Sequence, residues 1–187
     1  MNDWMKAERW AEQAHELYES GRYDRAAHRL QRAVEVNPYN PAWHFNLAIT
    51  LDALGRYDQA VVAYRQVLAL DADDVEALTG LGADYTRLGA HARALECFEH
   101  VERIEPAFEP AYCNRIITYA EMGDHDRAEL MFYLARQIEA DCPLCQYNIG
   151  NSLYARGEYD RAIACWTRAL QLDPEHPQAN ARIADAC

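Results

Sequence analysis

The chain has 187 residues, of which half are hydrophobic, and its formal net charge is −12. Lys6 is its single lysine, and an acidic chain of this kind lacks the clustered cations that binding to a phosphate backbone requires, so we expect no nucleic-acid partner. No signal-peptide run follows Met1, and no stretch approaches the roughly 20 apolar residues of a membrane span.

One frame recurs along the chain at an unbroken spacing of 34 residues, and its glycines are Gly21, Gly55, Gly89, Gly123 and Gly157. A fixed period of this length is typical of a solenoid, in which each repeat stacks on the next. The glycine can take the left-handed conformation that closes a helix, as we expect at Gly89. An aspartate such as Asp126 then opens the next helix, where it accepts unpaired N–H groups and opposes the helix dipole.

Each repeat therefore predicts two helices, and the five repeats cover 7–40, 41–74, 75–108, 109–142 and 143–176. Residues 177–187 begin another helix. This helix either caps the array or starts a sixth repeat that stops in mid-pattern at Cys187, so we expect the chain to be a fragment of a longer protein.

The pattern resembles the tetratricopeptide repeat family, whose unit is a helix–turn–helix of the same length. Leu81-Gly82 with Tyr85 echoes the Leu-Gly…Tyr pattern of its first helix, and Trp10 stands where the family often has tryptophan. The resemblance implies an all-α, right-handed α-solenoid of five repeats plus the C-terminal helix, as a single domain over 1–187.

The fourth repeat departs from the family pattern at Arg115 and Ile116, where leucine and a small residue are usual. We expect the branched Ile116 to push its helix away from the helix that carries Ala128. Arg115 should then be paired or should reach water. Either the repeat is merely loosened, or the bend shapes the binding surface.

In this family the first helices of the repeats line a concave groove. The resemblance implies a groove at Phe45, Asn46, Ile49, Asn114, Ile117, Tyr147, Asn148, Asn151 and Arg182, with His15, Thr79 and Cys113 at the same helical phase. An asparagine carboxamide can donate to a peptide carbonyl and accept from its N–H, so these asparagines could hold an extended chain. They could equally be ordinary polar residues on an exposed face, and the two aromatic residues either anchor a ligand or pack between repeats.

The family's carboxylate clamp for chaperone tails is incomplete, because only Asn148 and Arg182 match it from the fourth repeat. Cys142 and Cys145 form a C-x-x-C that could chelate zinc or cycle as a disulfide. Zinc needs two further ligands, and Cys113 and His176 are not at a recognised spacing. We therefore expect no metal and no cofactor, and take the two cysteines as small residues at a crowded helix junction.

The sequence contains no nucleophile elbow, phosphate-binding loop or H-E-x-x-H motif, so we expect no enzymatic activity. The function expected is a scaffold that binds a peptide or helix of a partner protein, without nucleic acid or membrane; self-association is compatible with the sequence. The alternative is the recognition domain of a larger enzyme or signalling protein, such as a glycosyltransferase. Six cysteines without a secretion signal suggest free thiols and a cytoplasmic location.

Overall fold

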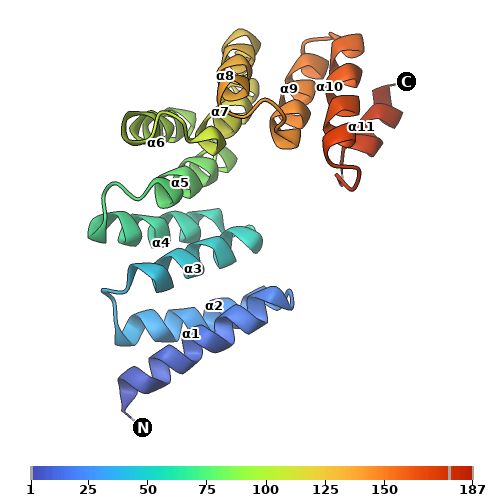
Figure 1. The fold of residues 1–187 in the computed structure, drawn as a ribbon. Coiled ribbons are helices and arrows are strands. Elements are labelled where there is room, and N and C mark those ends of the chain that lie inside the picture. Colours follow the sequence, from blue (N-terminus) through green and yellow to red (C-terminus); the bar gives the residue numbers. More distant parts are fainter. Residues whose placement is uncertain (1, 177, 187) are drawn as a thin grey trace. The chain divides into compact units, whose positions relative to one another are not determined.

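The computed structural model of the protein describes residues 2–176 and 178–186, and within them all regular structure is helical (Figure 1). The all-α prediction is confirmed. The helices are α1 (Asp3–Glu19), α2 (Tyr23–Val36), α3 (Pro41–Ala53), α4 (Tyr57–Leu70), α5 (Val75–Arg87), α6 (His91–Ile104), α7 (Glu109–Glu121), α8 (His125–Ile138), α9 (Pro143–Ala155), α10 (Tyr159–Leu172) and α11 (Ala179–Ala186). None of these helices has both the length and the apolar character that crossing a bilayer requires.

The turn inside each helix pair is closed by one of the repeated glycines, all of which have positive φ between 70° and 85°. Gly89 has φ 72°, as predicted, and its N–H donates to Thr86 O at 2.8 Å, while the N–H of Ala90 donates to Tyr85 O at 2.8 Å. These bonds satisfy carbonyl groups that the end of α5 would otherwise leave unpaired. The periodic glycine is therefore a backbone requirement of the turn.

The helices begin with different capping groups. The first helices α1, α3, α5 and α9 are capped by side chains, as at Asp74, whose carboxylate accepts the N–H of Ala77 at 2.8 Å, whereas α7 has no side-chain cap. The capping role expected of Asp126 is wrong, because Asp124 is the residue that accepts the N–H of Arg127 in α8. Asp126 lies in the first turn, where it opposes the helix dipole.

The chain forms two compact units, residues 1–100 and 101–187, and each is described by itself. In the first unit a continuous core of alanines and larger apolar side chains runs from α1 to α5. Small residues on first helices face large ones on second helices. One example is Gly82, where a Cβ would come within 2.5 Å of the Phe98 ring.

The second unit, residues 101–187, contains α7 to α11 and repeats the same small-against-large packing with one exception. Ile116 occupies the position where the fifth repeat has Gly150, and it is completely buried. Its partner Phe132 retains 8% of its surface exposed, whereas the equivalent Trp166 retains none. We attribute this difference to the branched side chain, which fills the space that a glycine leaves for the aromatic ring.

Arg115, the other departure in the fourth repeat, is buried and paired, which is one of the two outcomes expected. Its guanidinium donates to a carboxylate oxygen of Glu102 at 2.7 Å. The two partners differ in burial, because Arg115 is buried whereas the Glu102 side chain keeps 40% of its surface exposed to solvent.

Candidate functional site

The first unit carries a small cavity of about 30 Å³. Its lining comes from α1 to α3 and consists of Ala11, Ala14, His15, Tyr18, Leu30, Asn46, Ile49 and Thr50. Three of these residues, His15, Asn46 and Ile49, were predicted to face a groove. His15 and Asn46 are exposed at the mouth, and Ile49 is half-buried.

Phe45 precedes Asn46 in α3 and is half-buried. Its ring packs edge-on against Tyr64, with 5.8 Å between the ring centroids. Phe45 therefore has a packing partner within the core of the first unit, while part of its ring remains accessible.

In the second unit the candidate groove residues with unsatisfied polar groups lie on α9. Asn148 is only 6% exposed, and its Nδ2 has no hydrogen-bond partner among the described residues. Asn151, half-buried, has an unpartnered Oδ1. The two side chains share a helix face because they are three residues apart. Both atoms are buried and unpaired among the described residues, one a donor and the other an acceptor.

The other groove candidates of the second unit differ from this pair. Asn114 donates its Nδ2–H to Pro110 O at 2.9 Å, so part of its amide is used inside α7. Ile117 is half-buried, and Arg182 is exposed on α11. The repeated asparagines thus occupy different environments and do not form a uniform ladder.

Tyr147 is a packing residue in this structure. Its side chain is buried, its hydroxyl donates to Gln178 Oε1 at 2.8 Å, and its ring centroid lies 4.6 Å from that of His176. Of the two interpretations that the sequence left open, these contacts favour packing between neighbouring helices over an exposed anchor.

Three cysteines and a glutamate of the second unit converge on one point. Glu109 and Cys113 come from α7, whereas Cys142 and Cys145 come from the start of α9, and their ligand atoms all lie within 4.8 Å of one another. Cys113 and Cys145 are joined as a disulfide. Burial raises the pKa of the Cys142 thiol to about 11, and the carboxylate of Glu109 contributes to this increase.

Glu109 was not predicted as a candidate ligand, and Cys113 was considered beside the C-x-x-C but set aside because its spacing is not a recognised one. The signal that could have found them is the Glu109–Cys113 spacing of four residues, which places both side chains on one helix face. Because first helices of successive repeats pack together, that face meets the start of the next first helix. A set of thiols and a carboxylate is a donor set that suits zinc.

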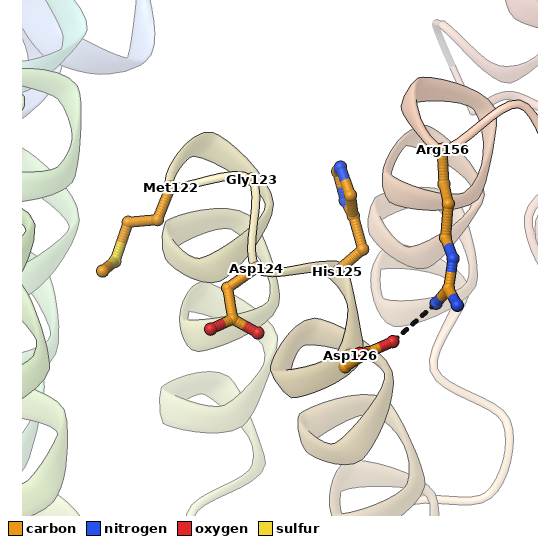
Figure 2. Close-up of a pocket in the computed structure, with 6 residues that line it drawn as sticks. All are labelled: Met122, Gly123, Asp124, His125, Asp126 and Arg156. Carbon is orange, nitrogen blue, oxygen red and sulfur yellow. Dashed lines mark hydrogen bonds and ion pairs between the residues drawn. The ribbon is translucent and has the colours of Figure 1, made fainter.

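An open hollow of about 410 Å³ lies at the turn between α7 and α8 (Figure 2), lined by Met122, Gly123, Asp124, His125, Asp126 and Arg156. Figure 2 shows Asp126 of α8 paired with Arg156, the C-cap residue of α9, at 2.8 Å. His125 Nδ1 lies 2.9 Å from Ser152 Oγ. The N–H groups of Arg127 lower the pKa of Asp124. These polar groups hold the turn to the following repeat, so their contacts are structural.

Family models described as tetratricopeptide repeat match residues 17–85 and residues 143–176. Among solved structures, TTC0263, a thermophilic protein of these repeats from Thermus thermophilus, is 26% identical, with a TM-score of 0.82 over 96% of this chain and 98% of that chain. A repeat protein from Parabacteroides merdae is 20% identical, with a TM-score of 0.74 over 97% of this chain and 72% of that one.

YrrB, described as a tetratricopeptide repeat protein with an unusual peptide-binding site, is 16% identical, with a TM-score of 0.63 over 92% of this chain and 89% of that one. At such identities the likeness is one of fold alone. No curated protein sequence gives a significant match.

Proposed function

Because the chain belongs to the tetratricopeptide repeat family, we propose that it binds an extended peptide segment of a partner protein on the inner face of its first helices. The family fold supports a role in protein–protein interaction, and proteins built of these repeats are generally scaffolds and not enzymes. The proposal adds where the peptide lies and which atoms hold it.

The observation that carries the proposal is the unsatisfied pair on α9. A buried polar group without a partner costs about 1–3 kcal/mol, and Asn148 Nδ2 and Asn151 Oδ1 are both in this condition. A peptide unit provides the complement, because its carbonyl oxygen accepts and its N–H donates. Because both atoms are buried, a peptide reaches them only when the side chains that cover this face of α9 move aside; its backbone would then satisfy both groups whatever side chains the peptide carries.

The cavity of the first unit supports the same function. Ala11, Ala14 and Ile49 give it an apolar floor, while His15 and Asn46 are polar groups at its mouth. A space of about 30 Å³ suits a single small apolar group, such as a methyl of an inserted side chain. The formal charge of −12 favours peptides with basic side chains over acidic ones.

The test begins with a peptide selected from a random library on the untagged full chain. Its dissociation constant is then measured for the parent and for the double variant Asn148→Ala/Asn151→Ala. We expect the constant to rise about tenfold, which corresponds to the loss of about 1.4 kcal/mol in hydrogen bonds. Circular dichroism checks that the variant remains helical.

The matched control is Gln137→Ala/Thr167→Ala, which removes two exposed polar side chains from second helices of the same unit. This control should leave the dissociation constant unchanged. Equal binding by the parent and the α9 double variant would contradict the proposed site.

A further inference from the structure

We propose that Glu109, Cys113, Cys142 and Cys145 form a zinc site in the second unit when its cysteines are reduced. None of these four residues belongs to the Asn148–Asn151 pair proposed above to hold the peptide, although Cys145 lies three residues before Asn148 on α9. The site would take a divalent metal ion that prefers thiolates. Zinc is such an ion, and it imposes no coordination geometry of its own.

The four ligands come in two chelating pairs. Glu109 and Cys113 are four residues apart on α7, so their side chains lie one turn apart on the same face. Cys142 and Cys145 form a C-x-x-C at the beginning of α9, where Cys142 is the N-cap. Two short-range pairs on two helices that pack together are the arrangement by which many structural zinc sites are built.

Opening the disulfide lets the Sγ atoms of Cys113 and Cys145 move apart, and the other distances at this point come close to those of a tetrahedral ion. Two thiolates on one zinc lie about 3.8 Å apart, since each Zn–S bond is about 2.3 Å. Cys113 Sγ and Cys142 Sγ are 3.7 Å apart. Glu109 Oε1 lies 3.0 Å from Cys113 Sγ and 2.7 Å from Cys145 Sγ, so an ion at the centre requires this oxygen to withdraw by less than about 1 Å.

The surroundings favour a cation at this point. In the reduced protein the thiols of Cys113 and Cys145 lie within hydrogen-bonding distance of Glu109 Oε1, and loss of their protons would place three thiolates beside this carboxylate. A metal ion between the three sulfur atoms and the carboxylate would compensate their charge. The N–H of Cys145 donates to Cys142 Sγ at 3.2 Å, which fixes the position of this sulfur at the N-terminus of α9.

Burial indicates a structural site and not a catalytic one. Cys113 and Cys145 are each 1% exposed, and Glu109 and Cys142 are half-buried. Four protein ligands leave no open position for a substrate. The ion would fasten α7 to α9, and thus the fourth repeat to the fifth.

Zinc binding and the Cys113–Cys145 disulfide exclude each other. A thiol reductant supplies two electrons and two protons to open the disulfide and is itself oxidised. Zinc then displaces the protons of the three thiols as it binds. The experiment therefore starts from fully reduced protein.

The test uses the untagged full chain, reduced, with zinc content determined by mass spectrometry and cobalt as the spectroscopic probe. We expect about one zinc ion per chain and the visible bands of a tetrahedral cobalt–thiolate site. Cys113→Ser should lose the bound zinc and the bands, and Glu109→Gln should weaken binding. The double variant Cys97→Ser/Cys165→Ser removes two free cysteines outside the site and should retain both signals.

A second measurement needs no variant and is unaffected if a substitution prevents folding. Bound zinc should protect Cys113, Cys142 and Cys145 from alkylation but leave Cys97 and Cys165 unprotected, as read by peptide mass spectrometry. Reduced parent protein without stoichiometric zinc, or zinc that protects these two groups of cysteines equally, would overturn the proposal.

Discussion

Gly150 lies directly against the indole of Trp166, so that a Cβ at Gly150 would come within 2.5 Å of Trp166 Nε1. This contact explains why the first helix of the fifth repeat needs a glycine at a position where glycine is otherwise unfavourable. The third repeat has the same combination in Gly82 and Phe98, whereas the first repeat pairs Ala14 with Leu30, both of them buried. The size of the first residue therefore sets how closely the two helices approach.

Gly150→Ala should destabilise the second unit by about 1–3 kcal/mol, because the ring is fully buried and cannot move aside without disturbing its neighbours. Urea unfolding followed by circular dichroism measures this loss. Adding Trp166→Leu to Gly150→Ala should restore part of the lost free energy of unfolding. The leucine is smaller, and Trp166 Nε1 has no hydrogen bond to lose. Strictly additive losses in this double-mutant cycle would show that the two residues do not compete for space.

Gly89→Val should cost about 1 kcal/mol or more through the backbone alone. Gly89 has φ 72°, and a Cβ there would meet nothing within 4 Å, so no clash contributes. Gly89→Asn is the matched control, because asparagine tolerates the left-handed region better than a branched residue does. Equal unfolding free energies for the valine and asparagine variants would mean that the turn rearranges.

Asp84 should make the first unit less stable as the pH rises. Burial raises the pKa of this carboxyl from 3.8 to about 8, and the nearby charge of Asp52 adds to the effect while Arg87 opposes it. The unfolded chain releases this proton near pH 4 and the folded chain only near pH 8. The stabilisation is therefore complete below about pH 4 and is lost as the pH rises from about 4 to about 8.

Asp84→Asn removes this titration. We expect the variant to exceed the parent in unfolding free energy by more than about 1 kcal/mol at about pH 9, with a smaller difference at about pH 5. Chemical denaturation of the variant and the parent at the two pH values measures this difference in unfolding free energy. A pH-independent difference between variant and parent would contradict the assigned cause.

Replacing Arg115 by leucine, the residue usual at this position in the family, should leave stability unchanged or increase it. A buried ion pair gains little over apolar packing, and Glu102 is exposed enough to be solvated without its partner. By contrast, Glu102→Ala leaves the buried guanidinium unpaired and should cost about 3 kcal/mol. Equal changes in melting temperature for Arg115→Leu and Glu102→Ala would contradict this expected difference.

The regular part of the fold could be predicted because one period controls it. The spacing of the glycines is sufficient to place the turns, and the turns separate the helices of each pair. The role of Asp126 was misjudged because Asp124 competes for the same N–H groups, and local pattern alone does not rank two neighbouring carboxylates.

The candidate sites were less predictable because they depend on contacts between repeats. The burial of Tyr147 results from Gln178 and His176, which lie in the following segment. The convergence of Glu109 with the cysteines depends on how α7 meets α9, which a spacing rule for one motif does not include. Contacts between neighbouring repeats therefore cannot be predicted from the pattern of a single repeat.

The most direct test of the proposed function follows the side-chain amide of Asn148 by NMR during titration with the selected peptide. The Nδ2–H resonances of Asn148, assigned by their loss in Asn148→Asp, should shift with the same dissociation constant as the peptide itself, because this donor gains an acceptor. The Nε2–H resonances of the exposed Gln137 should not move. Saturating peptide that leaves the Asn148 amide resonances in place would contradict binding at this face.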